Sequence, residues 1–314
     1  MSRNSLLVLY KKELADHLRS KRFVILLLLI AVTGLASIYS AASGIREAVS
    51  QEENDFVFLR LFTASGNSIP SFISFVSLLG PLVGLALGFD SINGEFNRGT
   101  MSRLLAQPIH RDSVINGKFL AGILVISIMV FSLGIVVGAI GILMIGIPPT
   151  LEEIFRLLSF FVVTIFYMSI WLAISQLFSL LFKQSATSAL ASIAMWLFLS
   201  IFVGLLAGVV ANVIFPIDNA STIDMQLKNS NLELMLNRLS PTTLFSEATI
   251  CLLNPGVRTL SIITVDRLIG AIPGALPFTQ SMLLIWPHLV SLIALNMICF
   301  AISYIIFMRR EIRA

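Results

Sequence analysis

The sequence predicts an all-α polytopic membrane protein with six transmembrane helices, and three observations support this fold class. Of the 314 residues, 57% are hydrophobic and only 12% are charged, which is too apolar for one soluble core. Uncharged runs long enough to cross the hydrocarbon of a bilayer recur along the chain,. Most lysines and arginines lie in alternate segments between these runs, as expected for a protein that crosses the membrane repeatedly.

Residues 1–22 form a basic segment ahead of the first apolar run. Leucine or tyrosine recurs in it at near-helical spacing, with lysines and arginines between, at Leu6, Tyr10, Leu14 and Leu18. We therefore expect an amphipathic helix in the membrane plane, with its basic side toward lipid headgroups. A solvated basic tail is the alternative.

Six apolar runs are expected to span the membrane as a single transmembrane domain. The first has the basic flank of a signal peptide, but its apolar part has full membrane length. In the second, Gly80, Gly84 and Gly88 lie four residues apart, which favours close helix packing over a ligand-lining surface,. The spans are expected at residues 23–42, 69–89, 119–147, 157–182, 186–215 and 283–308.

The charged residues predict the orientation in the cell (plasma) membrane. Segments on the side of the N-terminus carry 14 of the 21 lysines and arginines, whereas the other side carries 11 of the 17 acidic residues. By the positive-inside tendency both termini are cytoplasmic. The loop 90–118 and the tail 309–314 then lie in the cytoplasm, and the loop 216–276 lies outside.

The chain lacks the groups that several functions need. No Asp, Glu, Lys or Arg lies in the six apolar runs, whereas ion-coupled transporters bind their driving ion with such groups. There is no phosphate-loop motif, and the histidines and cysteines form no cluster with metal-ligand spacing,. We therefore expect a non-catalytic chain that binds no metal, cofactor or nucleic acid. The weakly polar spans favour an amphipathic or lipid-like cargo over an ion.

The longest charged segment, residues 88–118, separates the second and third spans. Gly94 and Gly99 permit sharp changes of direction in it, and Pro108 breaks it,. Between these positions, residues 100–107 are expected to form a short helix that is marginal in water and needs a docking partner. An ordinary solvated loop, with its acids and arginines paired to one another, is the alternative.

The same segment carries a pattern made of Phe89-Asp90, Gly94-Glu95, Arg98-Gly99-Thr100, Leu104-Leu105, Pro108, Arg111 and Gly117-Lys118. This pattern resembles the first cytoplasmic loop of ABC-2 type permeases, the membrane subunits of one class of ABC transporter. The nearest branch is that of the permeases related to nitrous-oxide reductase maturation. The basic first helix, the six spans and the stretch Ser240-Pro241-Thr242-Thr243-Leu244-Phe245 agree with this resemblance.

The resemblance implies that the loop carries a coupling helix docked on a separate cytoplasmic ATPase. Two such ATPase subunits, which bind ATP and magnesium, and a second permease copy, identical or related, would complete the transporter. Glu95 and Gly99 are expected to place the helix. The residues implied in ATPase coupling are Glu95, Asn97, Arg98, Gly99, Thr100, Met101, Arg103, Leu104 and Leu105.

The outer loop 216–276 is expected to hold short helices. Ser240 is a helix cap with Pro241 at the first helical position, and Asn254-Pro255-Gly256 ends the run, so a helix is predicted over 241–253,. A second is predicted over 257–272. In the family such helices lie over the exit of the translocation path, and a bland spacer is the alternative. The outer-helix residues singled out are Pro241, Thr242, Phe245 and Glu247.

These observations together predict the permease subunit of an ABC transporter that exports an amphipathic, lipid-like or peptide cargo. A non-transporting scaffold, or a subunit that transmits mechanical force to an extracytoplasmic protein partner, is the alternative. A secondary transporter or channel is disfavoured by the uncharged spans. Membrane lipid surrounds the chain in every case.

Overall fold

The computed structural model describes residues 2–49, 56–65, 69–101, 110–217, 222–258, 260 and 274–310, and the side chains of these residues except 2–5 and 44–49. Throughout these ranges every regular element is a helix. The elements are α1 (Ser2–Leu18), α2 (Lys21–Val49), α3 (Val57–Thr63), α4 (Phe72–Gly88), α5 (Asn93–Asn97), α7 (Arg111–Ile145), α8 (Leu151–Leu181), α9 (Ser185–Leu197), η1 (Phe198–Phe202), α10 (Val203–Ile214), α11 (Ile223–Asn237), α12 (Pro241–Leu253) and α14 (Phe278–Arg309).

Six helical stretches of the described chain are long and apolar enough to cross a membrane, which confirms the predicted all-α, multi-pass fold class. They are Lys21–Ser43, Phe72–Asn97, Arg111–Ile145, Leu151–Leu181, Ser185–Ile214 and Phe278–Arg309. Several extend beyond the apolar runs into the polar residues that flank them. The third, for example, begins at Arg111 instead of near residue 119.

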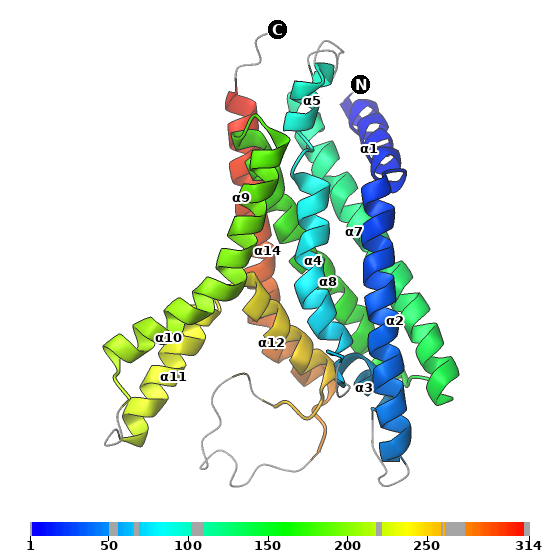
Figure 1. The fold of residues 1–314 in the computed structure, drawn as a ribbon, viewed down its shortest axis with the longest axis vertical. Helices are drawn as coiled ribbons and strands as arrows, with labels where there is room; N and C mark the ends of the chain where they lie inside the picture. Colours follow the sequence, from blue (N-terminus) through cyan, green and yellow to red (C-terminus); the bar gives the residue numbers. More distant parts are fainter. Residues whose placement is uncertain are drawn as a thin grey trace.

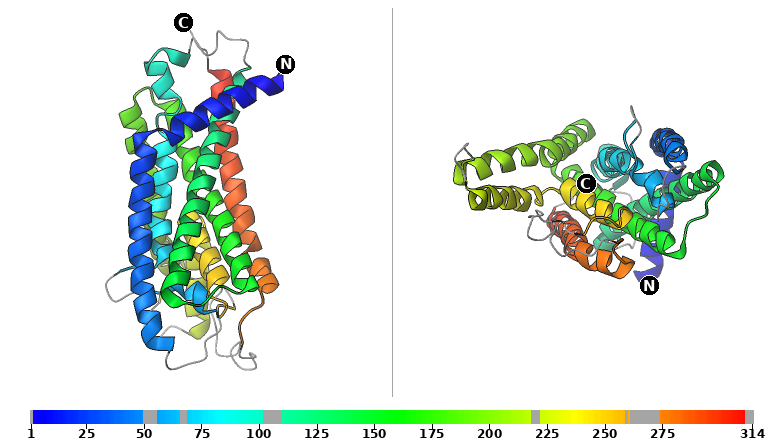
Figure 2. Two further views of the ribbon diagram at one scale, coloured as in Figure 1. Left: turned by 90° about the vertical axis from the view of Figure 1, so that its right-hand side faces the viewer. Right: turned by 90° about the horizontal axis from the view of Figure 1, so that it is seen from below.

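The start of α1 and the end of α14 lie at one end of the bundle, called the terminal end below (Figure 1). The helix α1 runs obliquely across this end and packs mainly on α7, whereas α2 follows the bundle axis (Figure 2). The opposite end carries α3 and α11. The placement of α1 in a membrane plane remains a prediction, since the structure contains no membrane.

The fourth spanning helix, α8, lies at the centre of the bundle. Inside the chain, 72% of its apolar window is buried, and α4, α7, α12 and α14 all pack on it. Its start is fixed by a capping box, in which Thr150 Oγ1 accepts from Glu153 N at 3.3 Å and Glu153 Oε2 accepts from Thr150 N at 2.7 Å,. The structure therefore has one central helix with the others arranged around it.

The helix α8 begins at Leu151, and Arg156 therefore belongs to it. The fourth span predicted from the sequence began at residue 157 and left Arg156 outside it, but the side chain of Arg156 is fully buried. It donates hydrogen bonds to Leu252 O at 3.0 Å and to Leu276 O at 2.5 Å, and pairs with Glu152 at 2.8 Å. These bonds join α8 to α12 and to the chain before α14, so this buried charge is satisfied.

The fifth spanning helix differs from the rest. Only 6% of its window is buried inside the chain, and the π-helix η1 interrupts it between α9 and α10. At this interruption it bends away, and α10 and α11 form a hairpin that spreads from the bundle (Figures 1 and 2). π-turns of this kind are one of the few causes of sharp bends in long helices.

Candidate functional site

The short helix α5 follows the second spanning helix at the terminal end and is held against α8. Ser179 Oγ of α8 accepts hydrogen bonds from the backbone N–H groups of Ile92 and Asn93, at 3.0 and 3.1 Å. Ser91 Oγ donates to Gly88 O at 2.8 Å and shapes the turn before α5. The start of the loop between the second and third spans is thus fixed to the central helix.

Two asparagines of α5 join it to the connection between α8 and α9. Asn97 Nδ2 donates to Lys183 O at 3.0 Å, and Ser185 Oγ donates to Asn93 Oδ1 at 3.0 Å. Asn97 is one of the residues predicted to couple to an ATPase. The connection between α8 and α9 and the first residue of the fifth spanning helix are therefore held against α5.

The predicted coupling residues divide into a buried and an exposed group. Glu95 and Met101 are buried, whereas 97–100 are exposed. Gly99 has φ +66°, a left-handed conformation that favours glycine, and the space around its Cβ position is open,. Thr100 Oγ1 donates to Glu95 O at 3.2 Å. Arg103, Leu104 and Leu105, also predicted here, lie outside the described residues.

The apolar side of this segment packs into a small cluster of its own. Met101 is fully buried, and so is Ile92 just before α5. The cluster gathers residues from α1, α7, α8 and α14, namely Leu9, Ile92, Met101, Val114, Ile115, Leu180 and Phe307. Four helices distant in sequence therefore hold the segment from beneath, and its exposed face points away from the bundle.

A buried ion cluster, missed by the sequence analysis, holds Glu95. Lys118 of α7 is 3% exposed, and its Nζ lies 2.8 Å from Glu95 Oε1 and 3.1 Å from Glu13 Oε2 of α1. Lys12 Nζ lies 3.0 Å from Glu13 Oε1 and 3.6 Å from Glu95 Oε1. Glu95 and Lys118 both belong to the family pattern, but nothing in the sequence indicates that they meet Glu13 and Lys12 in a buried cluster.

The cluster shifts the titration of its members on α1. Burial works to raise the pKa of Glu13, but the ammonium groups of Lys118 and Lys12 outweigh it and hold that pKa below its ordinary value,. Burial likewise opposes the charged form of Lys12, yet the carboxylates around it raise its pKa. Both groups are therefore charged at neutral pH, and α1, α5 and α7 are joined by ion pairs.

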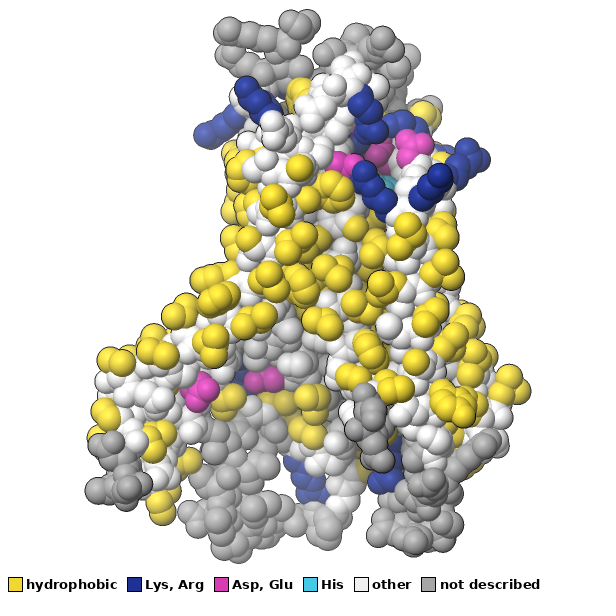
Figure 3. All heavy atoms as spheres, viewed as in Figure 1, with side chains coloured by type: hydrophobic (Ala, Val, Ile, Leu, Met, Phe, Trp, Pro, Cys, Tyr) yellow, Lys and Arg dark blue, Asp and Glu magenta, His cyan; other side chains and the backbone are white. Residues whose placement is uncertain are grey.

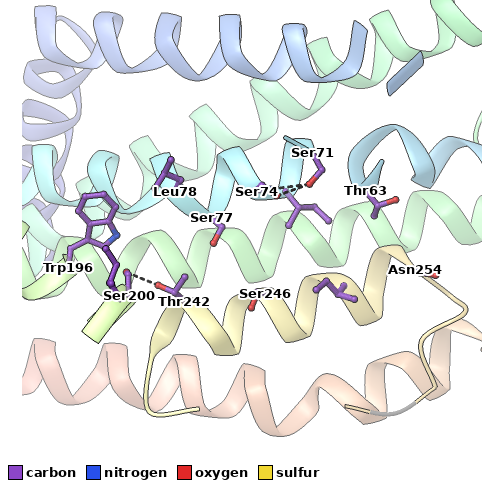
Figure 4. Close-up of a pocket in the computed structure, with 13 residues that line it drawn as sticks. Thr63, Ser71, Ser74, Ser77, Leu78, Trp196, Ser200, Thr242, Ser246 and Asn254 are labelled. Atoms are coloured by element: carbon purple, nitrogen blue, oxygen red, sulfur yellow. Dashed lines mark hydrogen bonds between the residues drawn. The ribbon is translucent and has the colours of Figure 1, made fainter. Parts of the chain in front are cut away.

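A second region is a cavity of about 550 Å³ that runs from the middle of the bundle toward the opposite end (Figure 4). It lies between α4, the fifth spanning helix and α12. Hydroxyl groups line it, from Ser71, Ser74 and Ser77 on the α4 side, Ser200 on η1, and Thr242 and Ser246 on α12. Trp196, Leu78 and Ile201 supply apolar walls, and its described lining has no charged side chain.

The hydroxyl groups are fixed by hydrogen bonds across the cavity wall. Thr242 Oγ1 lies 3.0 Å from Ser200 Oγ (Figure 4). It also lies 3.3 Å from Tyr167 Oη. The Tyr167 hydroxyl donates to Ser77 O at 2.8 Å. Neutral donors and acceptors on an apolar wall suit the polar part of an amphipathic molecule, and the described residues that line the cavity include no base to activate a nucleophile,.

The helix predicted over 241–253 matches α12, with Pro241 at its first turn and Ser240 Oγ accepting from Thr242 N at 3.2 Å. The outer-helix residues singled out from the sequence have different surroundings. Thr242 lines the cavity, and Glu247 faces α14. Phe245 is buried, and the centroid of its ring lies 4.2 Å from that of the Tyr167 ring. The helix α11 was not predicted, and the helix predicted over 257–272 lies mostly outside the described residues.

Glu247 joins the outer segment to the last spanning helix. Its Oε2 lies 2.5 Å from His288 Nε2 and accepts from Arg238 Nε at 2.8 Å. Burial works to raise the pKa of Glu247, but the hydrogen bonds from His288 and Arg238 outweigh it and keep that pKa below its ordinary value,. No group of three or more His, Cys, Asp or Glu in the described chain is placed to hold a metal ion.

Each comparison with known proteins gives a family or a protein of ABC transporters. The family model described as ABC-2 family transporter protein matches residues 7–312. The chain is 34% identical over 122 residues to the probable ABC transporter permease protein NosY of Stutzerimonas stutzeri. This alignment covers 38% of this chain and 39% of that protein. The protein of the same name from Pseudomonas aeruginosa is 33% identical over 120 residues, 38% of each chain. These alignments thus span less than half of each relative.

Proposed function

The chain belongs to the ABC-2 family of transporters, and on that premise we propose that it is the permease subunit of an ABC transporter. Two cytoplasmic ATPase subunits, which bind ATP and magnesium, would supply the energy. The observation that carries the proposal is the division of 95–101 into an exposed surface, 97–100, and buried anchors at Glu95 and Met101. A segment that docks a partner and transmits force needs both features.

The terminal end would face the cytoplasm, with both termini on that side. The excess of lysines and arginines in the segments at this end supports the orientation. The exposed edge 97–100 would lie in a groove of the ATPase, and Arg103, Leu104 and Leu105, which lie outside the described residues, are proposed to contact the ATPase as well. Gly99 would set the direction in which the coupling helix leaves α5, because its left-handed backbone turns the chain there.

Force would pass from α5 into the spans along the contacts already described. Asn97 contacts the connection that leads into the fifth spanning helix, and Glu95 contacts α7 through Lys118. Transduction requires that the loop bind the open and closed ATPase states with different free energies. The rigid attachment of α5 to α7 and α8 would convert that difference into movement of the spans.

The hydroxyl-lined cavity would contact the cargo, an amphipathic, lipid-like or peptide molecule moved outward. A second permease copy, identical or related, would cover the fifth spanning helix, whose window is only 6% buried within one chain. The polar wall of the cavity would then face a path between two copies. Thr242, on α12 and at the cavity wall, would link the outer helix to this path.

The test is assembly and activity with a phosphate-loop ATPase of the host. Gly99→Pro fixes φ near −65°, far from the observed +66°,. We expect this variant to lose ATPase co-purification and cargo-dependent ATP hydrolysis. Gly99→Asn is the matched control, because asparagine tolerates the left-handed conformation, and it should retain most of both. Normal assembly and activity of Gly99→Pro would contradict the proposal.

A second candidate function is transmission of movement to a protein partner outside the membrane, without transport. The hairpin of α10 and α11 favours it, since this hairpin spreads from the bundle at the opposite end (Figure 1). Removing α11 would then abolish capture of the partner but leave ATPase binding intact. If cargo flux into vesicles survives that deletion, the transporter proposal is favoured over this one.

A further inference from the structure

A cavity of about 420 Å³ at the terminal end shares Glu95, Arg98 and Lys118 with the segment proposed above to bind an ATPase, but ATPase binding does not account for the cavity itself. It lies between α1, the start of α2, the end of α4, α5 and α7. Five basic and four acidic side chains line it together with His17, and Phe23, Leu26, Ala86 and Leu87 supply an apolar wall. In Figure 3 the charged side chains gather at this end, above a face covered by hydrophobic ones.

The cavity lies at the depth of lipid headgroups. The uncharged run that starts at Phe23 is of the length that fills the hydrocarbon of a bilayer, so Lys21 and Arg22 stand at its boundary,. Below them, α2 presents exposed apolar residues at Val24, Ile25 and Leu28. Acyl chains can therefore lie along α2 while a headgroup enters the cavity.

Two cations at the cavity have no acidic partner in the described chain. Arg22 pairs with Asp90 at 2.6 Å, and Lys12 and Lys118 pair with acids of the ion cluster. Lys21 makes no ion pair with any described residue. Arg98 donates its Nε to Gly94 O at 3.0 Å, which leaves its other guanidinium nitrogens available. These two side chains can bind a phosphate group.

One acceptor at the cavity also lacks a partner. Glu95 is 7% exposed, and although its Oε1 pairs with Lys118, its Oε2 is buried and has no hydrogen-bond partner. A buried carboxylate oxygen requires a donor, and leaving it without one costs stability. A bound ammonium group would supply three N–H donors, whereas a quaternary ammonium group would supply none.

We propose that this cavity binds the headgroup of an amine-bearing phospholipid of the phosphatidylethanolamine class. On binding, the Glu95 carboxylate turns its Oε2 toward the cavity, where the ammonium group donates to it, and Lys21 and Arg98 bind the phosphate. The acyl chains follow the exposed face of α2. The lipid thus contacts α1, α2 and α5 together, at the point where the ion cluster already joins α1 to α5.

The lipid preference is measured by native mass spectrometry of the purified full-length chain in detergent, with matched acyl chains. Phosphatidylethanolamine should bind about tenfold more tightly than phosphatidylcholine, the difference that one charge-assisted hydrogen bond supplies. Its mono- and dimethyl derivatives, which keep an N–H, should rank between the two. Equal binding of phosphatidylethanolamine and phosphatidylcholine, or tighter binding of phosphatidylglycerol than of phosphatidylethanolamine, would overturn the proposal.

Different variants test the binding of the ammonium group and the binding of the phosphate group. Glu95→Gln should remove the preference for phosphatidylethanolamine over phosphatidylcholine but leave phosphatidylcholine binding unchanged. Lys21→Ala with Arg98→Ala should weaken binding of all phospholipids about tenfold, and Lys183→Ala, an exposed lysine away from the cavity, should not. If Glu95→Gln does not fold, the methylated lipid series on the unchanged protein still decides. Displacement of the lipid by equimolar soluble phosphoethanolamine would overturn the lipid assignment.

Discussion

At the residue scale, Lys118 is the side chain on which the terminal end depends most. It is 3% exposed and pairs with two acids from different helices. Removing one partner of a buried ion cluster costs more than the cluster contributes, because the remaining charges stay buried without compensation. The loss therefore exceeds that of an ordinary surface lysine.

We predict that Lys118→Met lowers the free energy of unfolding by about 3–5 kcal/mol, measured by denaturant titration in detergent. Lys183→Met is the control, since Lys183 is exposed, and it should change little. Adding Glu13→Gln and Glu95→Gln to Lys118→Met should restore part of the loss. A loss for Lys118→Met no larger than for Lys183→Met would show that the buried cluster does not contribute to stability.

His17 predicts a pH dependence. Burial lowers the pKa of its imidazole, so the unfolded state takes up a proton near pH 6.5 while the folded state does so only at lower pH,. The stability from neutral His17 is therefore complete above pH 6.5 and is lost as the pH falls through the folded pKa. The melting temperature should decline between pH 7.5 and 5.5, and less steeply in His17→Gln.

The matched control for that experiment is His110→Gln, because His110 is exposed. Its slope of melting temperature against pH should equal that of the unchanged protein. Identical slopes for His17→Gln and the unchanged protein would rule out His17 as a source of the pH dependence.

At the scale of elements, the contact of α4 with α8 is the closest in the bundle. A Cβ at Gly84 would overlap Met168 O and meet Leu172 N at 2.8 Å, and one at Gly88 would meet Leu172 O at 2.8 Å. Gly80 lies against the Met168 side chain. The three glycines predicted for helix packing thus lie in a row facing α8.

We predict that Gly84→Ala destabilises the protein by about 1–3 kcal/mol, because two backbones must separate. Gly138→Ala in α7 is the control, since a Cβ there meets nothing closer than Phe58 at 3.9 Å. This second change should be neutral or stabilise slightly, as alanine favours the helix. Equal melting temperatures of the two variants in detergent would contradict the assigned contact.

The sequence predicted the helices better than it predicted the contacts between their buried side chains. Helix α12 was found because capping residues and a terminating proline act locally. The burial of Lys118 and Arg156 was not predicted, because a charged residue at the edge of an apolar run gives the same sequence pattern whether its side chain contacts water or a buried carboxylate. The hydroxyl-lined cavity was not predicted, because Ser71, Ser74 and Ser77 share its wall with Ser200 and Thr242, which come from distant segments.

At the scale of the whole molecule, the hydroxyl-lined cavity and the exposed edge 97–100, which we propose to bind an ATPase, lie in different parts of one bundle. Helix α8 contacts both, through Ser179 near its end and through Tyr167 in its middle. A rigid central helix that touches both regions can carry movement between them. The proposed function therefore depends on the binding of the exposed edge 97–100 to an ATPase.

Photo-crosslinking tests this binding most directly. A photoreactive amino acid replaces Arg98 in the chain co-expressed with its host's phosphate-loop ATPases, and crosslinked partners are identified by mass spectrometry. If the edge 97–100 binds an ATPase, position 98 should give an ATPase adduct, and the yield of this adduct should change when a non-hydrolysable ATP analogue is added. Position 228, exposed on α11 at the opposite end, should yield no such adduct. An ATPase adduct from position 228, with none from position 98, would contradict it.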